Sequence, residues 1–209
     1  LGILTPGMEA AASTFIAGVL AARKGLKPPI GSISQMAHIR LGTKEEGRNP
    51  LIKDFVPLAE LDDLVFGGWD PISPNVLEAA RTAGVLEGDD LSEISSDLES
   101  IIPMEAVFDK KWVSRLDGVR VKDIESKWDQ AEALIQDIAN FKEENDCDRL
   151  VMVWCGSTEA FQEPSEVHAS VAAFEEGLRN SDPNISPSQI YAYAALQSDV
   201  PFANGAPNL

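Results

Sequence analysis

Short apolar runs alternate along the chain with longer stretches in which apolar residues recur at helical spacing. Four of the runs are typical of strands: LGILT at 1–5, LVF at 64–66, LVMVWC at 150–155 and VPFANG at 200–205. The third run holds six consecutive apolar residues between turn signals, which favours a central parallel strand buried on both faces. Strands separated by helical stretches predict a parallel sheet with crossover connections.

The segments between the strands predict helices, because their apolar residues recur every three to four positions. Ser73 is expected to cap the second helix, with Pro74 in its first turn. A helix at Ser165 lacks the Glu or Gln of a capping box, since His168 stands at that position. The expected helices cover 8–23, 71–84, 89–101 and 127–145, with two more beginning at Ser165 and Ser186, whereas 27–60 and 103–123 show no clear period. The fold class is therefore α/β, a parallel sheet with helices on both faces.

The charge of the chain narrows the classes of partner. The 209 residues carry a net charge of −17, with 17 basic and 34 acidic side chains. Such a surface repels phosphate backbones, so no nucleic-acid partner is expected. The apolar runs are too short to span a membrane and the start lacks signal-peptide features, which predicts no membrane partner and a cytoplasmic location. The two cysteines and two isolated histidines do not have metal-ligand spacing, so no metal site is expected.

Each strand ends in a turn that contains glycine. The turns are TPG at 5–7, FGGWD at 66–70, WCGSTE at 154–159 and FANGAP at 202–207. In an open parallel sheet, the carboxyl ends of the strands line the ligand crevice, and glycine lets a ligand approach the backbone closely. One such turn is weak evidence, but four on one sheet favour a nucleotide site.

Two acidic residues in these turns raise specific questions. In the first turn, the G-x-G-x-x-G/A template of dinucleotide sites is filled by Gly7, Glu9 and Ala12. A glutamate thus stands where a pyrophosphate approaches bare backbone. Asp70, after the second strand, suits the hydroxyl pair of a ribose. As an alternative, Asp70 caps the helix that follows it.

Several long motifs together resemble the myo-inositol-phosphate synthase family in its bacterial form. They are FVPLAELDDLVFGGWD, KEENDCDRLVMVWCGSTE, ISPSQIYAYAAL and VPFANGAPN, in the order and spacing of the family. The resemblance implies a Rossmann-like, doubly wound NAD domain with a second domain for catalysis and tetramerisation. It also implies an NAD-dependent conversion of D-glucose 6-phosphate into an inositol monophosphate, by oxidation, enolisation, intramolecular aldol closure and reduction.

The resemblance also assigns cofactor-binding positions. The first turn matches the pyrophosphate turn, Asp70 the acidic residue on the adenosine side, and the third turn a loop that contacts the cofactor. Arg115 lies in a segment that resembles another cofactor-facing loop. The residues so implied are Gly7, Met8, Glu9, Ala10, Asp70, Arg115, Cys155, Gly156, Ser157, Thr158, Asn204 and Gly205.

The chain departs from the family pattern in two places. Bacterial members carry glycine at the position of Glu9, and a carboxylate beside pyrophosphate costs free energy. NAD binding is therefore expected to be weakened unless Glu9 turns outward. The second departure is that the chain ends at APNL, before the family's catalytic lysines and its contacts to the substrate phosphate.

Residues 1–209 are accordingly expected to be an NAD-binding domain, incomplete at both ends, whose catalytic and tetramerisation domain follows residue 209. Such a fragment is expected to be inactive by itself, in a parent enzyme that forms a homo-oligomer. Two alternatives remain open at this point. One is an NAD-binding module or sensor without catalysis, and the other is an ordinary NAD-linked dehydrogenase.

Overall fold

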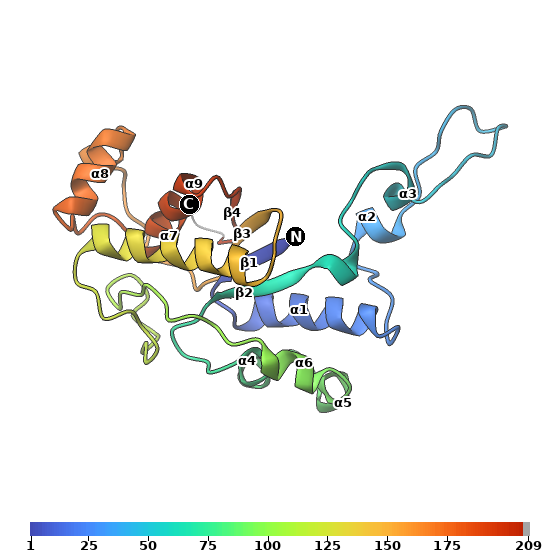
Figure 1. The fold of residues 1–209 in the computed structure, drawn as a ribbon, viewed down its shortest axis with the longest axis horizontal. Helices are drawn as coiled ribbons and strands as arrows, with labels where there is room; N and C mark the ends of the chain where they lie inside the picture. Colours follow the sequence, from blue (N-terminus) through green and yellow to red (C-terminus); the bar gives the residue numbers. More distant parts are fainter. Residues whose placement is uncertain (207–209) are drawn as a thin grey trace.

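The computed structural model describes residues 1–206 and contains a four-stranded sheet in the order β2-β1-β3-β4 (Figure 1). All three strand pairings are parallel. Helices flank the sheet, so the α/β class predicted from the sequence is confirmed. Residues 207–209, at the end of the predicted domain and of the fourth glycine turn, lie outside the described residues. The strands are β1 Gly2–Pro6, β2 Val65–Trp69, β3 Leu150–Trp154 and β4 Phe202–Asn204.

Helices cover both faces of the sheet. In Figure 1, α1, α4 and α6 lie on one side of the strands, and α7 and α9 lie on the other. The helices are α1 Ala10–Arg23, α2 Ile33–Met36, α3 Ile52–Phe55, α4 Val76–Ala83, α5 Gly88–Ser92, α6 Ser95–Ser100, α7 Lys127–Glu144, α8 Val171–Arg179 and α9 Pro187–Gln197, with 3-10 turns η1 Leu61–Asp63 and η2 Glu166–His168.

Alternation along the strands divides the apolar residues between two cores. Ile3 packs with α1 and α4 residues such as Ile16 and Val76. Its neighbour Leu4 faces the other side and packs with α7 residues such as Leu134. β3 lies between β1 and β4, as predicted for the central strand, but its burial is complete only at alternate positions. Each face of the sheet is thus closed by its own helical layer.

The start of α4 differs from the prediction, because Asn75 rather than Ser73 caps the helix. The Asn75 side-chain oxygen accepts a hydrogen bond from the Glu78 amide at 2.9 Å. The Ser73 amide instead donates to Asp70 Oδ1 at 2.7 Å. This bond holds the chain in a turn after β2, so the cap lies two residues later than expected and the helix begins at Val76.

The helix expected over 89–101 is interrupted, and α5 and α6 take its place. The Ser92 and Ser95 hydroxyls donate to the carbonyls of Asp89 and Ser92, which competes with regular helical bonding. Leu91, Ile94 and Leu98 are nevertheless all buried, as their spacing predicted. Apolar spacing therefore predicted the buried face correctly and the continuity of the helix wrongly.

The helix expected at Ser165 also begins later. Ser165 opens the 3-10 turn η2, and α8 follows with Ser170 as its cap, whose hydroxyl accepts from the Ala173 amide at 3.1 Å. His168 completes a capping box at Ser165 after all, because its Nδ1 accepts from the Ser165 amide at 3.0 Å. An imidazole nitrogen here takes the role that Glu or Gln usually has.

Residues 27–58, called the arm below, project from the sheet beyond the end of α1 (Figure 1). The arm contains α2, α3 and an antiparallel pair of segments bridged between His38 and Leu51 and between Leu41 and Arg48. Its sequence showed no clear period, and the structure shows isolated bridges with two one-turn helices.

Candidate functional site

Two glycine turns touch at the carboxyl ends of β1 and β3. Gly7 has φ +82°, and a Cβ atom placed on it would lie 2.3 Å from the Cα of Gly156. The Gly7 amide donates to the Trp69 carbonyl at 2.8 Å, and the Cys155 amide donates to the Pro6 carbonyl at 2.9 Å. The ends of β1, β2 and β3 are therefore held together by backbone contacts that leave no room for a side chain on Gly7.

Asp70 connects the first turn to the end of β2. Its side chain is completely buried, and both carboxylate oxygens accept backbone hydrogen bonds. Oδ2 accepts from the Met8 amide at 2.9 Å, and Oδ1 accepts from the amides of Ile72 and Ser73 at 2.8 and 2.7 Å. Three donors stabilise this carboxylate in its buried position, and they fix the Gly7–Met8 turn relative to β2.

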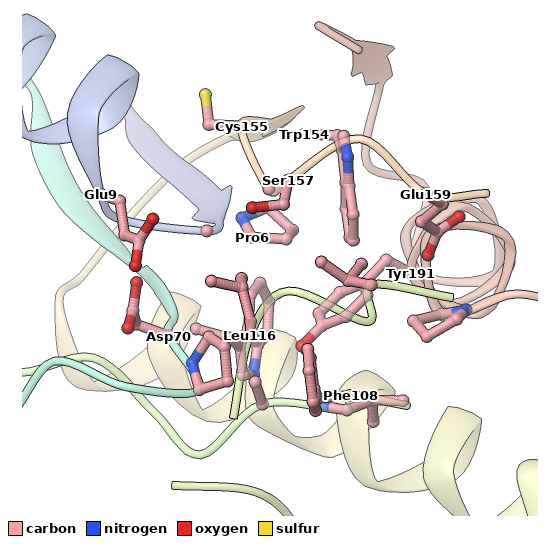
Figure 2. A pocket seen from close by; sticks show the side chains of 18 of the residues that line it. Pro6, Glu9, Asp70, Phe108, Leu116, Trp154, Cys155, Ser157, Glu159 and Tyr191 are labelled. Atoms are coloured by element: carbon pink, nitrogen blue, oxygen red, sulfur yellow. The ribbon is translucent and has the colours of Figure 1, made fainter. Parts of the chain in front are cut away.

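A cavity of about 210 Å³ opens between these turns (Figure 2). Its wall combines the strand ends with apolar side chains from residues 106–116 and with Tyr191 of α9. The Tyr191 hydroxyl accepts a hydrogen bond from the Val107 amide at 3.0 Å, and burial raises the pKa of this hydroxyl far above its usual range. The lining residues include Pro6, Gly7, Glu9, Ala10, Trp69, Asp70, Val107, Phe108, Val113, Leu116, Trp154, Cys155, Gly156, Ser157, Glu159 and Tyr191.

Glu9 points into this cavity rather than away from it. Glu9 lines the cavity, and in Figure 2 its carboxylate faces that of Asp70. Partial burial, and secondly the charge of Asp70, raise the pKa of Glu9 above its ordinary value of 4.5. The outward orientation that would have relieved the conflict with a bound pyrophosphate is therefore not the one observed.

Seven of the residues implied by the resemblance line the cavity: Gly7, Glu9, Ala10, Asp70, Cys155, Gly156 and Ser157. Met8 is buried in the core beside α1. Arg115 and Thr158 are exposed, and neither lines the cavity. Burial raises the pKa of the Cys155 thiol, which disfavours its reactive thiolate form.

Asn204 and Gly205 lie at the end of β4, next to the third turn. The Gly205 amide donates to the Trp154 carbonyl at 3.0 Å, and Asn204 Oδ1 accepts from the Ala206 amide at 2.8 Å. Asn204 contributes to a neighbouring cavity of about 360 Å³ that also contains His168 and Gln189. The two cavities share Glu159, so the fourth turn adjoins the main site without lining it.

The sequence interpretation missed the apolar wall formed by Phe108, Val113 and Leu116. These residues lie in the segment that showed no clear period, so periodicity did not mark them individually as facing a site. The signal that could have found them is the resemblance of the segment around Arg115 to a cofactor-facing loop, which pointed to the segment but not to these side chains.

The backbone of this site suits a dinucleotide pyrophosphate. Helix α1 begins at the first turn without a side-chain cap, and the first amides of a helix have no acceptors within it. Such amides, together with a turn glycine, form a common binding site for phosphate groups. The compensated charge of Asp70 is compatible with this use, whereas Glu9 adds an uncompensated carboxylate. NAD thus fits the backbone of the site and conflicts with one side chain.

Within residues 1–206, no group of three or more His, Cys, Asp or Glu side chains is placed to hold a metal ion. Among the helices of the same residues, none combines the length and the apolarity needed to cross a membrane.

The comparisons with known proteins agree with one another. The model of an NAD-binding family described as myo-inositol-1-phosphate synthase matches residues 1–209. Inositol-3-phosphate synthase 1 of Bacteroides thetaiotaomicron is 48% identical over 211 residues, which cover 100% of this chain and 48% of the relative. Inositol-3-phosphate synthase of Brassica napus is 33% identical over 213 residues, which cover 93% of this chain and 41% of the relative.

Structural comparison supports the same fold. The crystal structure of inositol-3-phosphate synthase from Caenorhabditis elegans superposes with a TM-score of 0.90 at 24% identity, covering 99% of this chain and 44% of that one. This chain therefore spans about half the length of the curated relatives it matches, or somewhat less. Because the family model matches the whole chain, the resemblance seen in the motifs is confirmed, and the chain belongs to the myo-inositol-1-phosphate synthase family.

Proposed function

We propose that residues 1–209 form the NAD-binding domain of an inositol-3-phosphate synthase. The observation that carries the proposal is the contact between Gly7 and Gly156, where the ends of β1 and β3 meet beside the start of α1. This contact leaves two turns of bare backbone around one cavity at the carboxyl edge of a parallel sheet, which is where open α/β folds bind nucleotides.

Each part of the site has a defined task in this proposal. The first amides of α1 bind the pyrophosphate, and Asp70 keeps the Gly7–Met8 turn in position for it. Ser157 supplies a hydroxyl for hydrogen bonding, while the wall of Phe108 and Leu116 excludes water. When bound, NAD supplies the acceptor for a hydride from the sugar and the donor that later returns it.

We further propose that the complete protein converts D-glucose 6-phosphate into a myo-inositol monophosphate as a homo-oligomer. The curated relatives are about twice as long as this chain, which supports placing the catalytic and tetramerisation domain outside residues 1–209. The cyclisation needs cations that hold the substrate phosphate and stabilise the enolate oxygen. The chain of 209 residues is therefore expected to bind NAD and to form no inositol phosphate.

Calorimetric titration of this chain with NAD tests the binding proposal. Saturable binding at one site is expected. Gly156→Val is expected to weaken it more than tenfold, because a Cβ on Gly156 lies only 2.8 Å from the Trp154 ring and the larger side chain fills the cavity. Gly88→Val is the matched control, since a Cβ on Gly88 has no atom within 4 Å. Absence of saturable binding to the unsubstituted chain would refute the proposal.

A second assay separates the alternatives for the complete protein. With NAD and glucose 6-phosphate, a synthase forms inositol monophosphate without net NADH, whereas an ordinary dehydrogenase accumulates NADH with product. A binding module forms neither, and the inward carboxylate of Glu9 is the observation that favours it.

A further inference from the structure

Backbone hydrogen bonds hold the third glycine turn at its two ends. Before the turn, the Cys155 amide donates to the Pro6 carbonyl at 2.9 Å. After the turn, the Ala160 amide donates to the Trp112 carbonyl at 2.9 Å. Among the described residues 1–206, the hydrogen bonds found do not involve residues 156–158. The backbone bonds therefore leave the middle of the turn, which lines the main cavity, without an anchor of its own.

Glu159 supplies a side-chain anchor for this turn. Both of its carboxylate oxygens accept hydrogen bonds from Ser188, Oε1 from the amide at 2.8 Å and Oε2 from the hydroxyl at 2.5 Å. Ser188 is the second residue of α9, and a carboxylate is favoured at the start of a helix because the amides there lack acceptors within the helix. Hydrogen bonds to a charged acceptor are also stronger than those between neutral groups. The third turn is thereby joined to the start of α9.

The same helix also holds the apolar wall of the cavity. Tyr191 of α9 accepts the hydrogen bond from the Val107 amide at 3.0 Å. In Figure 2, Glu159 lies on the Tyr191 side of the cavity, away from Glu9 and Asp70. The beginning of α9 is thus a common support for the third turn and the apolar wall, whereas Asp70 holds the first turn.

We propose that Glu159 is a positioning residue for the cofactor: through Ser188 it fixes the third turn in the arrangement in which Gly156 and Ser157 contact NAD. The part of this role that concerns NAD rests on the proposed function, whereas the effect on the turn itself does not. A carboxylate opposes the phosphates of a dinucleotide, so Glu159 is better suited to holding the turn than to binding the anion directly. Without this anchor the turn is less ordered, and NAD binding then has to order it.

Two substitutions that remove the same charge separate positioning from electrostatics. Glu159→Gln keeps an oxygen that accepts from the Ser188 amide and an amino group that donates to the Ser188 hydroxyl, whereas Glu159→Ala keeps neither. In calorimetric titration, the Gln variant is expected to retain the NAD affinity of the unsubstituted chain. The Ala variant is expected to raise the dissociation constant at least about tenfold, which corresponds to ordering the backbone of one residue. An effect of charge alone would change both affinities equally.

Backbone NMR order parameters of Gly156 and Ser157 test the same role without NAD. Values of about 0.85 are expected in the unsubstituted chain and in Glu159→Gln, and values below about 0.6 in Glu159→Ala. Ser188→Ala keeps the amide donor and loses the hydroxyl, so its values are expected to lie between the two. This variant provides the comparison if Glu159→Ala does not fold.

Gln189→Ala is the matched control at the start of the same helix. Gln189 Oε1 accepts from the Ser186 amide at 3.0 Å and its other hydrogen-bond partner is His168, not the third turn. The control is therefore expected to lose stability and to leave NAD affinity and the order parameters unchanged.

Three results would overturn the proposal. They are unchanged order parameters in Glu159→Ala, equal NAD affinities of the Ala and Gln variants, and a loss of affinity in Gln189→Ala as large as in Glu159→Ala. Failure of the unsubstituted chain to bind NAD would refute the proposed function instead. The order parameters alone would then support or overturn the anchoring of the turn by Glu159.

Discussion

Replacement of Gly7 by alanine tests the central contact of the site. The added Cβ meets backbone atoms of the third turn, 2.3 Å from Gly156 Cα, 2.5 Å from Gly156 N and 2.9 Å from the Cys155 carbonyl carbon. Backbone atoms cannot rotate away as a side chain can, so the two turns have to separate. Gly7 also has φ +82°, a conformation that is unfavourable for alanine.

Gly84 provides a control that isolates the steric part of this effect. It ends α4 at φ +63°, and a Cβ placed on it has no atom within 4 Å. Gly84→Ala therefore carries only the left-handed strain, about 1–2 kcal/mol. Gly7→Ala carries the same strain and an overpacking cost of about 1–3 kcal/mol. The free energy of unfolding is thus expected to fall by about 1–3 kcal/mol more in the first variant than in the second.

Urea unfolding of the two variants and the unsubstituted chain measures this difference. In thermal unfolding, each kcal/mol corresponds to about 2–4 °C for a domain of this size. Calorimetric titration is expected to show that NAD binding is lost in Gly7→Ala and retained in Gly84→Ala. Equal destabilisation by both substitutions would refute the argument, because the contact with Gly156 would then contribute nothing.

Three other substitutions test individual side chains of the site. The pKa of Glu9 is raised, and its ionised carboxylate opposes an anionic ligand, so NAD affinity is expected to increase as the pH falls through that raised pKa. Glu9→Gln is expected to bind NAD about tenfold more tightly at neutral pH and to flatten the dependence of NAD affinity on pH. An unchanged pH dependence in this variant would contradict the reasoning. Asp70→Ala leaves three amides without an acceptor, two of them in buried bonds, and is expected to lower the free energy of unfolding by at least about 3 kcal/mol, with a smaller loss for Asp70→Asn. Equal losses in urea unfolding would count against these bonds. Tyr191→Phe removes the acceptor of the Val107 amide and is expected to cost about 1–3 kcal/mol in the same assay, whereas unchanged stability would show that the amide finds another partner.

The sequence predicted the layers of the fold well because local patterns determine them. Each strand run became a strand, and helix α7 begins at the predicted residue, where Ser126 caps it by accepting from the Asp129 amide. The helix boundaries that were predicted wrongly depend on hydrogen bonds that compete with regular helical bonding. Ser73 does not cap α4 because Asp70 holds residues 70–73 in a turn and the helix begins only at Val76. Serine hydroxyls divided the helix expected over 89–101.

The glycine turns of the candidate site could be predicted from the sequence. The side chains that pack around the cavity could be predicted much less well. Glycine at positions 7 and 156 marked turns that the structure brings into contact. The side chains of the apolar wall were not predictable from periodicity, since Phe108 and Leu116 reach the cavity from a segment without regular structure, although the resemblance around Arg115 had pointed to that segment. Their position depends on hydrogen bonds such as the one between the Val107 amide and Tyr191, 84 residues apart in the chain.

Asp70 shows how a residue's environment decides between interpretations that its sequence position leaves open. At the end of a strand, an aspartate suits a ribose as well as the start of the next helix. The structure gives it a third arrangement, in which one carboxylate oxygen accepts from the first turn and the other from the turn after β2. Because the Asp70 side chain is completely buried, its hydrogen bonds to the backbone contribute to the stability of the folded state. Its influence on a cofactor is therefore expected to act through the position of the Gly7–Met8 turn, so that loss of NAD binding and loss of stability in its variants should increase together.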